Sequence, residues 1–415
     1  MKKTKIDLKI PLFFIWPLGA FLASFTSIAS RKSQIIYVLF VTLFGYSFAF
    51  TETTADSYRV ALVFNEFDYR NISVIFNEYL SGYQTDLYRF SIYSVVKSFT
   101  NNPKILFASL GFVFGIFSYK SLKLFLQVKG LEKSFSIFIL CVIFFSLNSI
   151  ANINGARFYT AAIICLCSII NLMYYNNNRL WLLGLLSTFL FHFSFLIIIP
   201  FLLMMYLFRK LLFKADQTSP WIFTIFVLTF LCSFILESNI INLSSLSSFL
   251  FPSLASKLEL YNSSELAEVY EERGKSLFHT VATTFNYVAR FYIFILILKI
   301  KKTLKNATDE NPELQQLFNF LLLFFSITFM LTLFPSGGRF MTISTQIFFF
   351  FLIRFYVKFK SNELQKYILG LVPVYLFLVL FSVLYLSSLL TEGVLWYGNL
   401  FWIIYEGIGY EFIYV

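Results

Sequence analysis

Long apolar runs alternate with short polar connections along almost the whole chain. A helix needs about 17 to 25 mostly apolar residues to cross the roughly 30 Å of hydrocarbon in a membrane. Nine runs have about this length and are predicted to be membrane-spanning helices: residues 34–50, 104–119, 134–150, 158–175, 220–238, 280–298, 314–333, 340–357 and 366–389. A tenth run, residues 10–29, contains Pro11 and Pro17. It either spans the membrane or lies in it as a re-entrant or interfacial piece.

One apolar block, residues 180–207, does not fit a simple crossing. Arg179 precedes it, and Arg209 and Lys210 follow it. Because Lys and Arg collect on the cytoplasmic side of membrane proteins, both ends are expected there. About 28 helical residues reach only roughly 42 Å, which is too short for two ordinary crossings. We therefore expect a re-entrant or broken helix whose apex, near His192, faces protein or a water-filled cavity. A single long tilted helix is the alternative.

Two longer stretches are expected on the extracytoplasmic side. Residues 51–103 mix acids, tyrosines and apolar residues at roughly helical spacing, which predicts short amphipathic helices along the outer membrane surface. Residues 239–279 are Ser-rich and then charged, which predicts a loop over the cavity. The whole pattern predicts an all-α polytopic integral membrane protein with about nine to eleven transmembrane helices, in which residues 1–415 form one transmembrane domain.

The composition excludes an ordinary soluble protein, since 58% of the residues are hydrophobic, 13% are charged and the mean hydropathy is +0.74. Lys and Arg gather in the connections assigned to the cytoplasm, so the net charge of +11 reports topology and not nucleic-acid binding. The four cysteines lie in apolar runs without the spacing of a metal site. With no nucleotide-binding motif either, neither a metal nor a cofactor is predicted.

Polar residues at the ends or breaks of apolar runs are the first candidates for chemistry. Arg157 and Arg339 are expected at helix starts, where a guanidinium fork and free N–H groups would hold a phosphate. Arg290, inside the run 280–298, is a third candidate ligand, although it could instead pair with a carboxylate. His192 could orient or deprotonate a hydroxyl group. Each arginine could also be an interface anchor, and the histidine a packing residue.

The outer stretch supplies a second set of candidates. Asp56 and Asp86 could act as general bases. Tyr58 offers an aromatic ring next to Asp56 on which a flat ligand could stack. All three are also ordinary residues for a segment at a membrane surface.

The string NINGARFYT (residues 152–160) and the FHFS element around His192 together resemble the core of the EpsG-type branch of Wzy-like polysaccharide polymerases. ADSYR (residues 55–59) and GYQTDLYRF (residues 82–90) resemble the outer segment of that family, although the residues flanking the Asp-Tyr pair depart from its usual pattern. The resemblance extends from about residue 34 to 358.

This resemblance implies an enzyme of the bacterial cytoplasmic (inner) membrane whose active site faces outside. It would transfer a glycan chain from undecaprenyl pyrophosphate to another lipid-linked repeat unit. The product would be an O-antigen, a capsule or an exopolysaccharide, and a flippase and a chain-length regulator would be partners. For this reaction the expected catalytic residues are His192 and Asp56, and the expected substrate ligands are Arg157, Arg339, Arg290, Asp86 and Tyr58.

Three other functions compete with this one. A flippase for lipid-linked oligosaccharides would also have a basic cavity, but it should consist of two similar halves, which the sequence does not display. An O-antigen ligase would use similar Arg and His residues with a different acceptor. A membrane acyltransferase would carry a His or His-Asp signature with clearer spacing than that of the isolated His192.

Overall fold

The computed structural model describes residues 8–51, 55–84, 86–127, 135–175, 180–213, 219–235, 277–305, 312–334, 337–359, 362–408 and 410. In chain order the helices are α1 (Lys9–Ile15), α2 (Pro17–Ser24), η1 (Phe25–Ser27), α3 (Arg31–Tyr46), α4 (Asp56–Glu66), α5 (Ile72–Leu80), α6 (Leu87–Lys97), α7 (Pro103–Leu126), α8 (Phe135–Leu147), η2 (Ile150–Gly155), α9 (Ala156–Met173), α10 (Leu180–Phe191), α11 (Phe195–Leu207), α12 (Arg209–Leu212), α13 (Pro220–Ile235), α16 (Leu277–Lys305), α17 (Pro312–Leu331), η5 (Gly337–Phe340), α18 (Met341–Lys358), α19 (Asn362–Leu390), α20 (Val394–Tyr397) and α21 (Leu400–Gly407). The expected loop 239–279 lies outside the described residues, except for its last residues, which begin α16.

Six helical stretches of the described chain are long and apolar enough to cross a membrane: Pro103–Leu126, Cys141–Met173, Thr283–Lys305, Pro312–Leu331, Gly337–Lys358 and Glu363–Ser382. Three further apolar helices, α10, α11 and α13, are shorter. The predicted runs 134–150 and 158–175 correspond to α8 and α9, which η2 joins within one apolar stretch. The structure confirms an all-α polytopic membrane protein. Within the described residues six stretches reach full membrane length, and one of them joins two of the nine predicted runs.

The run at residues 10–29 does not form one continuous helix. It divides at Trp16 into α1 and α2, with 7 and 8 residues, and Pro17 occupies the first position of α2. At 1.5 Å per residue these helices measure about 10 and 12 Å, so neither can cross the membrane. Both pack against α3. Of the two expectations for this run, the structure favours a re-entrant or interfacial piece.

The apolar block at 180–207 is broken where the sequence predicts. α10 ends at Phe191 and α11 begins at Phe195. The intervening turn is closed by hydrogen bonds from the Phe195 amide to the His192 carbonyl (3.1 Å) and from the Leu196 amide to the Phe193 carbonyl (2.9 Å). A single uninterrupted helix is therefore excluded. That both ends of the pair return to the same side of the membrane stays a prediction.

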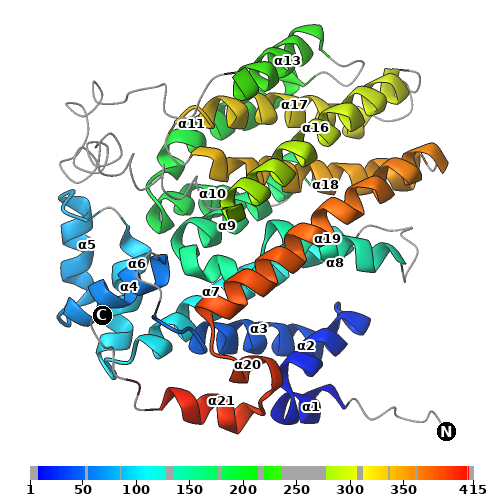
Figure 1. The fold of residues 1–415 in the computed structure, drawn as a ribbon. Helices are drawn as coiled ribbons and strands as arrows, with labels where there is room; N and C mark the ends of the chain where they lie inside the picture. The colour runs from blue at the N-terminus through cyan, green and yellow to red at the C-terminus, as the bar shows by residue number, and fades with distance from the viewer. Residues whose placement is uncertain are drawn as a thin grey trace, which may run out of the picture.

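The long helices run side by side across the view of Figure 1, and α4, α5 and α6 gather at one end of the bundle. α9 is its central helix, because 15 of its 18 residues are buried. Its side chains contribute to both large apolar clusters of the protein, one with α3 and α7 and the other with α10, α17 and α18. A polar residue at the start of α9 is thereby fixed relative to both halves of the bundle.

The stretch 51–103 contains three short helices, α4 to α6, as its amphipathic pattern predicts. Asn154 Oδ1 accepts a hydrogen bond of 2.6 Å from the Ser57 amide, which ties the start of α4 to η2. Tyr93 Oη donates to the Val60 carbonyl (3.0 Å), which joins α6 to α4. These bonds hold the group against the start of α9. That this end of the bundle is extracytoplasmic stays a prediction.

α3 and α7 approach each other closely at Gly45. A Cβ atom at this position would overlap the main-chain carbonyl of Phe107 on α7. We expect Gly45→Ala to destabilise the protein by about 1–3 kcal/mol, because the neighbour is backbone and cannot move away like a side chain. The measurement is the thermal unfolding midpoint in detergent, with Gly338→Ala as control, since nothing lies within 4 Å of a Cβ there. Equal midpoints for the two variants would contradict the close approach.

The end of the chain returns to the start of α7. Lys104, in the first turn of α7, is fully buried and forms an ion pair with Glu392. Close by, Phe48 and Thr391 form an isolated β-bridge, and Asn102 Nδ2 donates to the Gly407 carbonyl (2.9 Å). α20 and α21 are therefore fastened to the helix that begins at Pro103.

Candidate functional site

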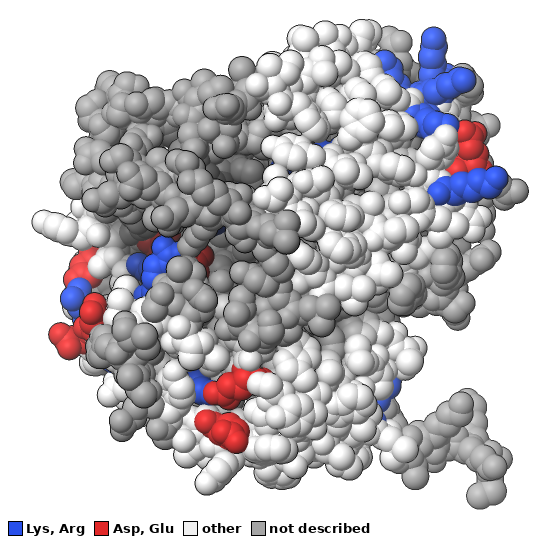
Figure 2. Space-filling model, viewed as in Figure 1, with Lys and Arg blue, Asp and Glu red and all other residues white. Residues whose placement is uncertain are grey.

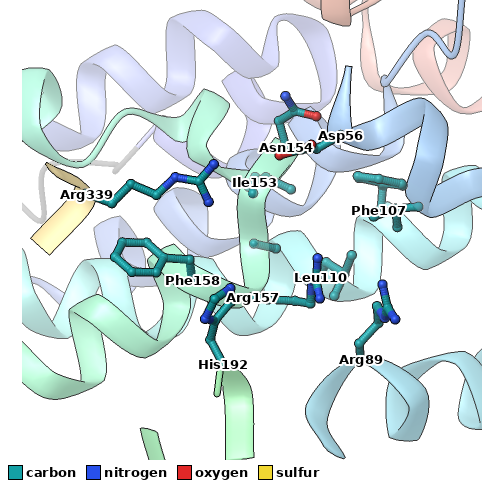
Figure 3. Close-up of a pocket in the computed structure, with 13 residues that line it drawn as sticks. Asp56, Arg89, Phe107, Leu110, Ile153, Asn154, Arg157, Phe158, His192 and Arg339 are labelled. Atoms are coloured by element: carbon teal, nitrogen blue, oxygen red, sulfur yellow. The ribbon is translucent and has the colours of Figure 1, made fainter. Parts of the chain in front are cut away.

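A pocket of about 450 Å³, counting its open mouth, lies where α4, α6, α7, η2, α9, the α10–α11 break and η5 meet (Figure 3). Thirteen residues line it: Asp56, Val60, Arg89, Phe107, Leu110, Ile153, Asn154, Gly155, Ala156, Arg157, Phe158, His192 and Arg339. Of the residues singled out from the sequence, the structure brings together Asp56, Arg157, His192 and Arg339. The two that are farthest apart in the sequence, Asp56 and Arg339, are separated by 283 positions.

Arg157 projects from the first turn of α9 and forms an ion pair with Asp86. The Asp86 side chain is fully buried, whereas that of Arg157 is 30% exposed and faces the pocket. The second carboxylate oxygen of Asp86 accepts a hydrogen bond from the Phe193 amide (3.4 Å). One carboxylate at the start of α6 therefore holds both α9 and the break after α10. In this structure Asp86 supports the pocket from behind and does not line it.

Arg89, one turn after Asp86 on α6, is a pocket residue that the sequence argument missed. Its guanidinium lies over the Phe90 ring at 4.5 Å, and its Nε atom has no hydrogen-bond partner among the described residues. Burial lowers the pKa of Arg89, and the positive charge of nearby Arg157 lowers it further. An anion placed between the guanidiniums of Arg89 and Arg157 would raise the pKa of Arg89 again, because it would stabilise both positive charges. The sequence feature that could have identified Arg89 is its spacing of three residues from Asp86, which puts both residues on one helix face.

His192 occupies the break between α10 and α11. Its Nδ1 atom is 2.8 Å from Ser194 Oγ and accepts a hydrogen bond of 3.3 Å from the Ser194 amide. Its ring packs edge-on against Phe158 of α9, with the centroids 5.5 Å apart. Only 8% of the residue is exposed, although it lines the pocket. The local turn and the aromatic neighbour thus set the orientation of the imidazole.

Arg339 and Asp56 complete the polar wall. Arg339, on η5, lies 5.9 Å from the centre of the Phe158 ring, on the opposite side of the pocket from Arg89 in Figure 3. Asp56 begins α4 and pairs with Arg59 at 2.9 Å, and the two side chains are 46% and 55% exposed. This exposed pair remains accessible to solvent and to a ligand.

Two other predicted ligands are not brought to the pocket wall. Tyr58 lies on α4 between the pocket residues Asp56 and Val60, but its side chain is buried. It belongs to the apolar cluster that also contains side chains of α3 and α7. Arg290 lies on α16 with its guanidinium over Tyr287, 5.3 Å from the ring centre. The described chain contains no cluster of three or more His, Cys, Asp or Glu side chains suited to a metal ion.

The site therefore has three arginines from α6, α9 and η5 at its wall, with one exposed carboxylate and one histidine beside them. Guanidiniums bind phosphate oxygens through paired N–H groups. These charge-assisted hydrogen bonds are stronger where water is scarce. The apolar residues Phe107, Leu110 and Phe158 line the remaining wall. This arrangement suits an anionic group attached to a bulky, partly apolar molecule.

Comparison with known protein families gives a match over most of the sequence. The model of the EpsG family aligns with residues 35–399, which include every residue of the pocket wall. No curated protein sequence and no solved structure matches significantly. Since the aligned region covers most of the 415 residues, this chain is a member of the EpsG family.

Proposed function

We propose that the protein polymerises polysaccharide repeat units carried on polyprenyl pyrophosphate. A glycan chain would be transferred from its lipid carrier to a sugar hydroxyl of a second lipid-linked unit. The observation that carries this proposal is the convergence of Arg89, Arg157 and Arg339 around His192 and Asp56 in one pocket. Membership of the EpsG family supports a polymerase role.

The arginines suit the leaving group of this reaction. As the bond between the anomeric carbon and the pyrophosphate oxygen breaks, negative charge grows on that oxygen. Preorganised cations in a water-poor site stabilise such charge more strongly than water does. Arg157 is positioned for this by Asp86, and Arg89 adds a second guanidinium beside it. The energy of transfer comes from the pyrophosphate linkage itself, so no nucleotide sugar is required.

The acceptor hydroxyl must be oriented and must lose its proton. Asp56 and His192 are the carboxylate and the imidazole of the described pocket wall, and both are side-chain types that serve as general bases. They approach the pocket from α4 and from the α10–α11 break. A sugar between them would lie beside the arginines and within the apolar wall.

The charge distribution suggests which end of the bundle faces outward. Figure 2 shows mainly Lys and Arg, with a few acids, where α16 ends and α19 begins, whereas Asp and Glu lie beside Lys and Arg near α4 to α6. Lys299 pairs with Glu363 in this basic region at 2.7 Å. Since basic residues favour the cytoplasmic side, we place the pocket at the outer face of the cytoplasmic membrane.

The test is reconstitution of the purified protein in vesicles with polyprenyl-pyrophosphate-linked repeat units. We expect a ladder of multimers together with release of polyprenyl pyrophosphate. Units that only become accessible on the other leaflet, without a ladder, would indicate a flippase. Transfer only when a different acceptor is added would indicate a ligase. Either of these results would overturn the polymerase proposal.

A further inference from the structure

The hydrogen bonds within the turn after α10 determine where His192 carries its proton. Nδ1 lies 3.3 Å from the Ser194 amide nitrogen and 2.8 Å from Ser194 Oγ. A main-chain N–H can only donate, so Nδ1 must accept from it. The Ser194 hydroxyl can rotate to donate to the same atom. Both contacts are satisfied together only when Nδ1 is unprotonated and the neutral ring carries its proton on Nε2.

We infer that His192 serves the reaction as a hydrogen-bond donor through Nε2, and that the base which takes the acceptor proton is Asp56. This inference rests on the proposed function. For Nε2 to act as a base, the ring must first carry its proton on Nδ1. That proton would face the Ser194 amide, which would lose its acceptor. The turn is also held from outside, because Asp86 accepts from the Phe193 amide (3.4 Å), so it resists rearrangement.

The surroundings of His192 favour a neutral donor. Phe158 and Phe193 pack against the ring with centroid distances of 5.5 and 5.2 Å. Arg157 and Arg339 line the same pocket, so a positive imidazolium there would meet other positive charges. A neutral N–H can instead share a phosphate oxygen with these guanidiniums.

If His192 is a hydrogen-bond donor, Asp56 is the group that takes the proton of the acceptor hydroxyl. It is the carboxylate on the described pocket wall, and its side chain is 46% exposed. Asp86 is buried and engaged with Arg157 and the Phe193 amide. In the transfer, the acceptor O–H proton passes to Asp56 and the acceptor oxygen bonds to the anomeric carbon. The carbon–oxygen bond to pyrophosphate breaks, and its electron pair stays on the phosphate oxygen, which receives the Nε2–H hydrogen bond.

The first test compares substitutions in the vesicle assay. Glutamine can present an amide N–H near the position of Nε2 but cannot act as a base. We expect His192→Gln to stay within about 10-fold of wild type, His192→Ala to lose about 100-fold and Asp56→Asn about 1000-fold. Thermal midpoints of all three variants identify any that fail to fold. If His192→Gln is as inactive as His192→Ala while Asp56→Asn retains activity, histidine is the base and the inference is wrong.

A second test does not depend on activity, so it separates this inference from the proposed function. The chain contains two histidines, and replacing His279 leaves His192 as a single signal in a protein labelled with nitrogen-15 histidine. The two neutral tautomers have distinct nitrogen chemical shifts. We expect the Nε2–H form in wild type and a detectable population of the other form in Ser194→Pro, which removes the amide donor. An Nδ1–H ring in the otherwise unchanged protein would overturn the inference.

Discussion

Arg157→Lys is expected to reduce the rate of polymer formation by about 100-fold or more, in the range observed when a preorganised donor to a developing oxyanion is removed. Lysine keeps the positive charge next to Asp86 but lacks the planar fork that binds two phosphate oxygens at once. The protein should remain folded because the buried carboxylate keeps a cationic partner. The measurement is the initial rate of multimer formation with purified protein in vesicles, at saturating lipid-linked substrate.

Arg290→Lys is the matched control for this substitution. Arg290 also lies in a long apolar helix, yet it is absent from the pocket wall and stacks on Tyr287. We expect the Arg290→Lys variant to form multimers at a rate within about twofold of wild type, because Arg290 makes no contact with the transition state. Equal rate losses in both lysine variants would show that the pocket in Figure 3 is not where the pyrophosphate binds.

Asp86→Asn is expected to destabilise the protein by about 3 kcal/mol, near the lower end of the range for breaking a buried ion pair. The lower end applies because the Arg157 side chain is 30% exposed and keeps part of its hydration. Without the carboxylate, Arg157 and Arg89 face each other with no negative charge between them. The hydrogen bond to the Phe193 amide weakens as well, so α6 should separate from the α10–α11 break. Chemical unfolding in detergent and hydrogen exchange of α6 amides measure these effects.

Asp56→Asn provides the contrast on the same wall. Its ion pair with Arg59 is exposed to solvent, and such pairs contribute about 0–1 kcal/mol. Its unfolding free energy should therefore remain close to that of wild type, although polymer formation is lost. If Asp86→Asn is as stable as Asp56→Asn, the buried carboxylate does not organise the site.

Much of the fold could be predicted because hydrophobic run length and basic residues leave clear signals in the sequence. The break at His192 is an example, since the length of the block 180–207 conflicted with the charges at both its ends. The division of residues 10–29 into α1 and α2 was not predicted, because the sequence left open both a span and a re-entrant or interfacial piece. Composition alone does not reveal whether prolines at a helix start interrupt a span, whereas the packing of both short helices on α3 does.

The site was only partly predictable, for a related reason. Arg157 and His192 stand out because an ionisable residue in an apolar run is unusual. Arg89 does not, because an arginine in an amphipathic outer helix looks like any surface residue. The partnership of Asp86 with Arg157 depends on a contact between residues 71 positions apart, which spacing along the chain does not encode. Arg290 is also an ionisable residue in an apolar run, yet in the folded protein it lies over Tyr287 and is not part of the pocket wall.

The pairing of Lys104 with Glu392 has a consequence for biosynthesis. The two residues are 288 positions apart, so the ribosome makes the counter-charge of the buried lysine long after it has made α7. Phe107 and Leu110, which line the pocket, follow Lys104 within two turns of α7. An unpaired buried charge is strongly unfavourable, so this wall of the pocket reaches its final packing only after Glu392 has been made and has met Lys104.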